Sequence, residues 1–225
     1  IGSARVAANY DSGTGTTELL FRYTVAAGEL DGNGITVGTL SANGGAIRGG
    51  SIDADLTLNN VGGTADVKID AQKPSVTGVS SAKVNGLYKA GAVIPVAVTF
   101  SEPVIVTGTP QITLETGEAD RAIGYESGSG TATLVFTYTV QSGDTANDLD
   151  YVSSSALSVN DGSIRDAAGN DAVTALAAPG TIGSLGANKA IAIDTIEPKV
   201  GSVVMPAAGS YKAGDVLTIT VHTDE

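Results

Sequence analysis

Two runs of the chain place an apolar residue at every second position. The first run covers 94–100 and the second covers 134–140. Period two over seven residues predicts half-buried strands, because successive side chains of a strand point to opposite faces. No segment shows a sustained apolar stripe at helical spacing, and turn signals such as Asp161-Gly162 separate the runs. The pattern predicts an all-β chain. The alternating apolar residues are Ile94, Val96, Val98 and Phe100, then Leu134, Phe136, Tyr138 and Val140.

The same pattern occurs more than once, so the chain contains an internal repeat. YDSGTGTTELLFRYTV, starting at Tyr10, returns as YESGSGTATLVFTYTV, starting at Tyr125, at an offset of 115. VKIDAQKPSV returns as IAIDTIEPKV at an offset of 124, and GLYKAGAVIPVAVTFSE returns as GSYKAGDVLTITVHTDE at an offset of 123. Ile47-Arg48 returns at an offset of 117, so the growth to 124 localises an insertion within 166–189.

A repeat of this length with many short strands predicts an antiparallel β-sandwich rather than a βαβ fold. Pro74 and Pro198 fix their own φ angles and keep the preceding residues extended, so we expect short, stiff links between consecutive sandwiches. Cutting at these prolines gives three expected parts: the C-terminal strands of one repeat at 1–73, a complete repeat at 74–197, and the start of another at 198–225. The expected overall shape is a rod.

The internal alignment places Ile1 near Leu114 and Glu225 at Glu102, so the first and last parts are both incomplete repeats. About eleven residues, equivalent to PVIVTGTPQIT, would complete a second sandwich from them. Exposed sheet edges promote aggregation, so we expect the chain to sample a longer polypeptide whose neighbouring repeats cover these edges. The alternative is that adjacent subunits complete each other's half-domains by strand addition and so build a filament.

Composition narrows the classes of function. The formal net charge is -12, which disfavours nucleic acid as a partner because an acidic surface repels phosphate. No apolar run reaches the roughly 20 residues of a membrane-spanning helix. There is no cysteine, and His222 is the only histidine, on the outward face of its expected strand, so nucleophilic triads of the usual kind are not available. We therefore expect a protein that is not an enzyme.

Several strings resemble the bacterial immunoglobulin-like tandem repeats of large secreted adhesins and biofilm-matrix proteins. They are YKAGDVLTITVHTDE, SEPVIVTGTPQITLETG, FTYTVQSGDTANDLDY, GSIRDAAGNDA and GSLGANKAIAIDTIEP. The resemblance extends over essentially the whole chain. The resemblance implies immunoglobulin-like sandwiches on the extracellular surface of a bacterium. It implies that they act as stalk modules that hold a terminal adhesive domain, of unknown ligand, away from the cell. It also implies that calcium stiffens the junctions between repeats.

One expected junction carries a set of oxygen ligands. Calcium takes six to eight oxygens from carboxylates and carbonyls on loops. In such a sandwich the incoming linker, the end of the second strand and the loop before the last strand meet at one pole. The residues there are Asp70, Glu102, Asp166, Asn170 and Asp171. For the following junction the matching residues are Asp194 and Glu225, with Glu197 nearby.

An alternative interpretation is that Asp166 and Asn170 only form Asx turns in a solvated loop. The first repeat does not carry the same loop, because the stretch aligned with DAAGND is GGSIDAD. There Gly49 replaces Asp166 and Asp53 replaces Asn170, so that junction is expected to bind differently or not at all.

Overall fold

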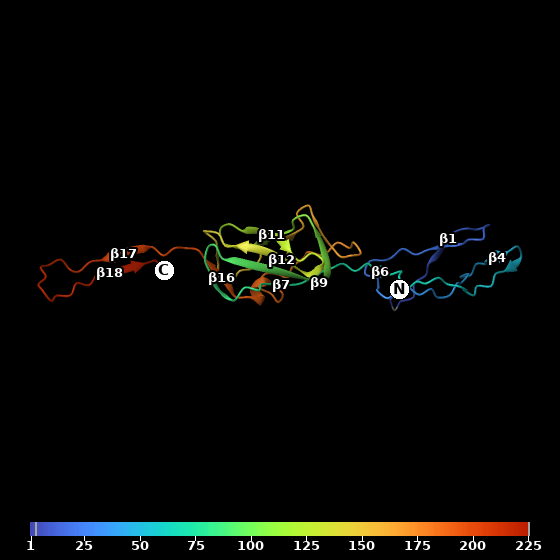
Figure 1. The fold of residues 1–225 in the computed structure, drawn as a ribbon, viewed down its shortest axis with the longest axis horizontal. Coiled ribbons are helices and arrows are strands. Elements are labelled where there is room, and N and C mark those ends of the chain that lie inside the picture. The colour runs from blue at the N-terminus through green and yellow to red at the C-terminus, as the bar shows by residue number, and fades with distance from the viewer. Residues whose placement is uncertain (3, 225) are drawn as a thin grey trace.

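The computed structural model describes residues 1–2 and 4–224, and strands dominate it. The named strands pair antiparallel except β8 (Gly86–Tyr88) and β16 (Ile191–Asp194), which pair parallel. The all-β prediction is therefore confirmed. The described residues form three parts along the longest axis (Figure 1), which we call the N-terminal segment (1–73), the central segment (74–197) and the C-terminal segment (198–224).

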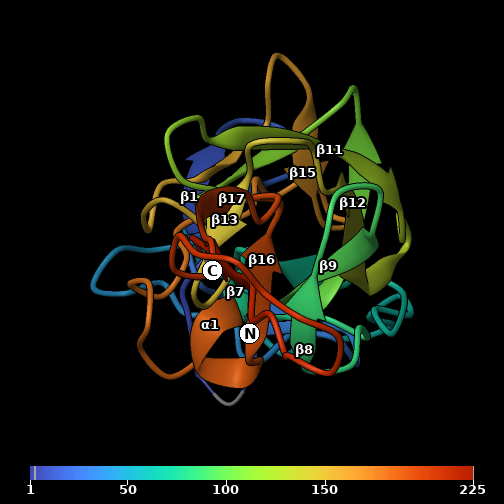
Figure 2. The same ribbon diagram turned by 90° about the vertical axis from the view of Figure 1, so that its left-hand side faces the viewer.

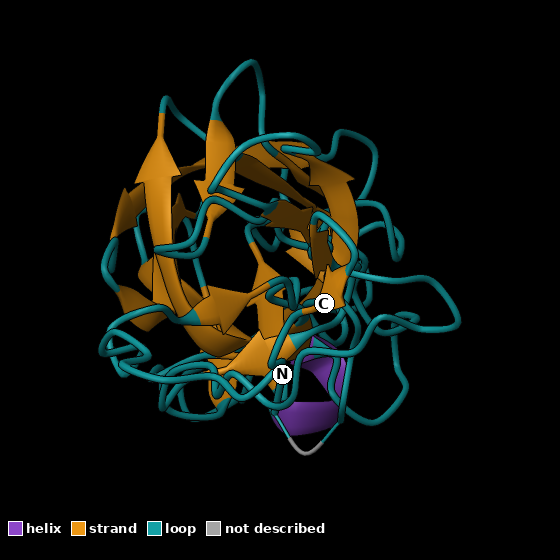
Figure 3. Ribbon diagram, turned by 90° about the vertical axis from the view of Figure 1, so that its right-hand side faces the viewer, coloured by secondary structure: helices purple, strands orange, loops and turns teal. Residues whose placement is uncertain are grey.

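The central segment contains two sheets. The larger has the order β14-β10-β11-β12-β9-β15, with β7 also paired to β9, and the smaller has the order β13-β16-β8. Viewed along the long axis, these strands surround the interior (Figures 2 and 3). Their bounds are β7 Val76–Ser80, β8 Gly86–Tyr88, β9 Val93–Thr107, β10 Gln111–Leu114, β11 Arg121–Ser127, β12 Thr131–Thr139, β13 Thr145–Ala146, β14 Leu157–Ser158, β15 Ser163–Arg165 and β16 Ile191–Asp194.

The buried hydrophobic core of the described residues lies entirely between Val79 and Ile193. Its centre is the antiparallel pairing of β9 with β12, where Val98 faces Leu134 and Val96 faces Phe136. All four side chains are fully buried. The alternation predicted from the sequence therefore points the apolar positions inward, because both runs form strands of one sheet.

One short helix, α1 (Leu185–Asn188), occurs in the described chain, next to β7. The Ser184 side chain caps it by accepting a hydrogen bond from the Ala187 amide at 3.1 Å, as serine commonly does at helix starts. Leu185 is fully buried, and the Asn188 amide donates to the Val79 carbonyl at 2.8 Å. The insertion found in the repeat alignment thus contains the helix α1, which packs against β7. No helical periodicity in the sequence predicted this helix.

The two outer segments are single layers of paired strands. Their described residues contribute no hydrophobic side chain to the core. In the N-terminal segment β1 (Asn9–Ser12) pairs with β2 (Leu20–Arg22), β3 (Leu30–Asp31) with β6 (Ile69–Asp70) and β4 (Arg48–Gly49) with β5 (Ile52–Asp53); in the C-terminal segment β17 (Val200–Val204) pairs with β18 (Thr220–Thr223).

The β1–β2 pair repeats the geometry of β11–β12. Tyr10 faces Phe21 as Tyr125 faces Phe136, and each pair is followed by the same irregularity in register. The two rings meet edge to face in both places, with centroids 5.9 Å apart in the first and 6.1 Å in the second. Equivalent residues of the repeat therefore form equivalent local structure.

The β17–β18 pair repeats the pairing of β7 with β9. Val203 faces Val221 as Val79 faces Val98, and both pairs carry a register shift two residues earlier along the first strand. What the outer segments lack is a counterpart of the β9–β12 pairing, because β2 and β18 lie in different segments at opposite ends of the molecule (Figure 1).

Candidate metal centre

Three acidic residues meet where the N-terminal and central segments join. Asp70 ends β6, and Asp166 follows β15. The expectation that Glu102 ends the second strand is wrong, because β9 continues without a break to Thr107 and Glu102 lies within it. One carboxylate oxygen from each lies within 4.8 Å of the others. This is the pole at which the sequence placed the linker, the second strand and the DAAGND loop.

The linker is held against β9 by a reciprocal pair of hydrogen bonds. The Ser75 amide donates to Ser101 Oγ at 3.0 Å, and the Ser101 amide donates to the Ser75 carbonyl at 2.8 Å. The Val173 amide also donates to the Pro74 carbonyl at 2.7 Å. Glu102 follows Ser101 directly, so these contacts fix its position beside the incoming chain.

The loop after β15 folds around the Asp166 side chain, which is buried. Asp166 Oδ1 accepts a hydrogen bond from the Asn170 amide at 2.8 Å, and Gly169 turns the chain with φ +96°. Asn170 Nδ2 donates to Asp166 Oδ2 at 2.7 Å and to the Asp70 carbonyl at 3.1 Å. These are turn hydrogen bonds of the kind the alternative interpretation expects, and one of them also crosses the junction to the linker.

The pKa values of Glu102 and Asp166, the two better-buried carboxylates of this cluster, are shifted in opposite directions. Burial raises the pKa of Glu102, and the nearby charges of Asp70 and Asp166 raise it further. Burial also opposes ionisation of Asp166, but hydrogen bonds from Asn170, Gly169 and Ala168 prevail and lower its pKa. Ionised Glu102 therefore sits against two like charges, a cost that a bound cation would remove.

The remaining candidate residues lie elsewhere. Asp171 pairs with Arg165 at 2.6 Å on the surface instead of joining the cluster. Asp194, in β16, borders a hollow at the opposite pole, lined by residues such as Leu87 and Ile196, and its Oδ1 accepts a hydrogen bond from the Ile196 amide at 3.0 Å. Glu225 lies outside the described residues. The structure thus brings together Asp70, Glu102 and Asp166, with Asn170 bonded to two of them.

The first repeat departs from this loop in a way that the sequence alignment misplaced. Arg48 pairs with Asp53 at 2.5 Å and faces it across β4 and β5, as Arg165 faces Asp171. Asp53 is therefore the counterpart of Asp171, not of Asn170, because the first repeat's loop is one residue shorter. The distinguishing signal, an arginine paired across the turn, is visible only in three dimensions.

A second buried carboxylate, Asp144, was not singled out from the sequence. It accepts hydrogen bonds from Tyr138 Oη at 2.6 Å and the Gln141 amide at 2.9 Å, and it pairs with Arg121 at 2.7 Å. Burial opposes its ionisation, yet the bonds from Arg121 and Tyr138 lower its pKa. Its counterpart Glu29 makes the equivalent bonds with Tyr23 and Ala26. The sequence carries a signal for Asp144: an acidic residue follows the strand tyrosine by six positions in both repeats, Glu29 after Tyr23 and Asp144 after Tyr138.

The donor set of the cluster fits a hard cation. Three carboxylates supply up to six oxygens, and carboxylates together with backbone carbonyls are the ligands calcium prefers in proteins.

Comparison of the chain with protein-family models, curated proteins and solved structures finds no match. Within the described residues, no helix has both the length and the apolar character needed to cross a membrane.

Proposed function

We propose that this chain is a structural extension module of a bacterial cell-surface adhesin or biofilm-matrix protein, acting outside the cell. In this proposal the central segment is an immunoglobulin-like sandwich, and the outer segments belong to further copies of it arranged as a rod. Its parts follow one another along a single axis (Figure 1), and equivalent residues of the repeat make equivalent strand pairs.

The observation that carries the proposal is the construction of the first junction. Asn170 of the central segment bonds the Asp70 carbonyl of the linker, and the Ser75–Ser101 pair fastens the next residues to β9. These contacts limit rotation between consecutive parts. A module that determines length and direction needs such a restrained junction more than it needs a cleft.

Calcium bound by Asp70, Glu102 and Asp166 would stiffen this junction. The three residues come from the linker, from β9 and from the loop after β15, so one ion would join all three elements. A ligand that binds only the folded state stabilises it by mass action, by about 2.7 kcal/mol at a concentration one hundred times the dissociation constant. Relief of the repulsion around Glu102 would add to the differential affinity.

Calorimetry of the 225-residue chain tests the calcium proposal. We expect calcium to raise the melting temperature relative to EDTA, and magnesium to do so less, since it demands a smaller octahedral site. Asp70→Asn should remove most of the calcium shift. The matched control is Asp171→Asn, a neighbouring carboxylate bound to Arg165, which should leave the shift intact. An identical melting temperature in calcium and EDTA would contradict the proposal.

Localisation tests the wider function. Antibodies against the central segment, applied to intact cells that produce the protein, should label thin tethers at the surface in electron micrographs. Label that requires permeabilised cells would contradict an extracellular stalk.

A further inference from the structure

One strand pair of the central segment is parallel, and it joins the two ends of that segment's chain. β16 pairs parallel with β8, with Ile191 opposite Gly86 and Ile193 opposite Tyr88, whereas the other named strand pairs are antiparallel. On its other side β16 pairs with β13. β16 is the last strand of the segment, and β8 follows the first strand, β7, after the short connection 81–85.

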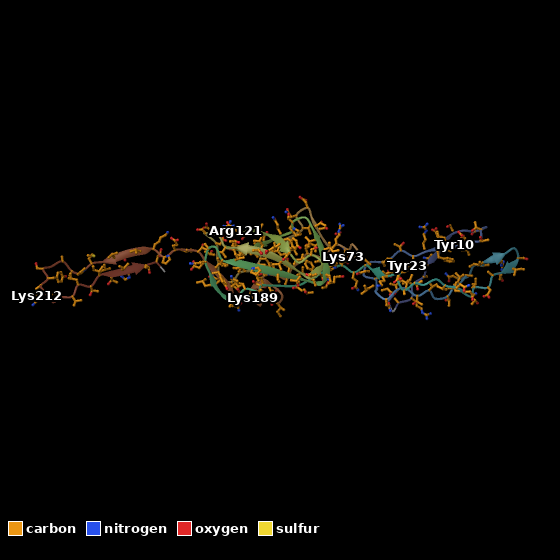
Figure 4. All side chains as sticks on the ribbon, in the orientation of Figure 1. Tyr10, Tyr23, Lys73, Arg121, Lys189 and Lys212 are labelled. Carbon is orange, nitrogen blue, oxygen red and sulfur yellow. The ribbon has the colours of Figure 1, made fainter. Side chains whose placement is uncertain are left out.

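The first and last strands leave the segment at opposite poles. β9 begins beside the hollow that Asp194 borders and reaches the first junction at Glu102, so β7, antiparallel to β9, runs from the junction toward the hollow. β16 runs parallel to β8, which leads into the same hollow at Tyr88. The outer segments accordingly attach at opposite ends of the central one (Figure 1), and Lys73 and Lys189 lie toward those two ends (Figure 4).

Tension along the chain therefore acts along these strands. A pull on the N-terminal segment draws β7 out at the junction, and a pull on the C-terminal segment draws β16 out at the opposite pole. Ladder hydrogen bonds run between strands rather than along them, so a force along a strand loads several of them at once. Extending the segment thus requires β7 to shear from β9 or β16 to shear from β8.

Side chains add hydrogen bonds beside the parallel pair. Asn188 Nδ2 donates to the Val79 carbonyl of β7 at 2.8 Å, and Asn85 Oδ1 accepts from the Ala190 amide at 3.2 Å. The Gly86 amide, at the start of β8, donates to the Ala190 carbonyl at 3.0 Å. The residues that lead into β16 are therefore bonded both to β7 and to the start of β8.

The insertion that contains α1 contributes to the same fastening. Gly183 lies within 166–189, where the repeat alignment localises the insertion, and its carbonyl accepts a hydrogen bond from the Val79 amide at 2.8 Å. The chain that leaves β16 is also held. Thr195 Oγ1 donates to the Asp144 carbonyl at 2.9 Å and accepts from the Gly143 amide at 2.8 Å.

We propose that the β8–β16 pair, with Asn85 and Asn188, is a mechanical clamp that lets the central segment withstand tension along the chain. The inference rests on the proposed extension function for the source of the tension, but the clamp acts without a bound cation. Resistance to forced unfolding depends on the unfolding rate, so the bonds that join the first strand to the last should determine the lifetime under load.

Constant-force spectroscopy of the full chain tests the clamp. The sequence has no cysteine, so Gln72→Cys and Glu197→Cys provide attachment points on either side of the central segment. Its unfolding should release on the order of 400 Å of chain in one step. In EDTA the clamp variant, Asn85→Ala with Asn188→Ala, should have a lifetime under load shorter by roughly tenfold, because two hydrogen bonds between the strands under tension are lost.

The matched control removes hydrogen bonds away from β7, β8 and β16. Ser129→Ala loses the bond from the Val106 amide, and Thr131→Ala loses the bonds to the Gly128 and Thr133 carbonyls. This control should lower the melting temperature about as much as the clamp variant does, yet leave the lifetime under load unchanged. Equal shortening of the lifetime in both variants, or shortening in neither, would overturn the clamp.

The measurement separates the clamp from the proposed function. It is made in EDTA on the purified chain, so a failed clamp leaves the calcium shift in melting temperature and the surface labelling as independent tests of the extension module. A chain that shows the clamp but labels only permeabilised cells would retain the mechanical property and lose the proposed extracellular role.

Discussion

β9 and β12 pair with each other in the central segment, whereas their counterparts β18 and β2 lie in different segments and do not pair. Val96 and Phe136 are fully buried opposite each other, whereas β18 lies at one end of the molecule and the β1–β2 pair at the other (Figure 1). The alternating pattern is the same in both places. Local pattern therefore determines which residues form strands and which face is apolar, but burial depends on a partner strand distant in the chain.

Hairpin and loop geometry survives without the core. Tyr23 bonds Glu29 in the N-terminal segment as Tyr138 bonds Asp144 in the central one, although only the second pair is buried. Such short-range contacts close small loops at low entropic cost, so they do not require long-range pairing. The comparison separates short-range structure, which the N-terminal and central segments share, from the buried core, which lies in the central segment.

The largest expected effect comes from truncating a core aromatic. Phe136→Ala should destabilise the central segment by about 3–5 kcal/mol, because it removes a fully buried ring and leaves a cavity. The matched Phe21→Ala should leave the central transition unchanged. Urea denaturation followed by circular dichroism measures both, and similar losses from the two variants would show that the outer segment already shares the central core.

The next effect concerns the buried carboxylate. Asp144→Asn should cost about 2 kcal/mol, because hydrogen bonds to a charged acceptor are lost in the interior. Glu29→Gln should not alter the central transition. Since the folded-state pKa of Asp144 is lowered, its stabilising contribution is present above the unfolded value, near about 4, and is lost as pH falls through the folded pKa. Acid unfolding curves of wild type and Asp144→Asn should therefore converge at low pH.

Glu102 should behave in the opposite sense. Its pKa is raised in the folded state, so its protonated form stabilises below the unfolded value, and that contribution is lost as pH rises through the folded pKa. Glu102→Gln should then stabilise the metal-free protein at neutral pH by less than about 1 kcal/mol, since solvent screens the site. In calcium the same substitution should destabilise it. The same sign of change in EDTA and in calcium, measured by calorimetry, would count against the cation site.

The smallest effect is expected at the surface ion pair. Asp171→Asn should change stability by less than about 0.5 kcal/mol, because both partners are largely exposed. Asp53→Asn, the matching substitution in the N-terminal segment, should change the stability of the protein equally little. A large loss from Asp171→Asn in thermal unfolding would contradict its assignment to an exposed ion pair of little energetic weight.

Much of this arrangement was predictable from the sequence. Period two located β9 and β12, and the repeat alignment aligned Tyr10 with Tyr125 in equivalent pairs. The convergence of Asp70, Glu102 and Asp166 was predicted by placing the linker, the second strand and the DAAGND loop at one pole. What could not be predicted depends on contacts that leave no periodic trace: the four-residue helix α1, the diversion of Asp171 to Arg165, and the one-residue-shorter loop that makes Asp53 its counterpart.

The most direct test of the comparison is hydrogen exchange measured along the chain. Amides of β9 and β12 should be protected to the full unfolding free energy at every concentration, because they exchange only when the core opens. Amides of β2 and β18 should exchange rapidly in dilute protein, because no buried core covers these strands. Protection of β2 and β18 equal to that of β12 in dilute monomer would contradict the account.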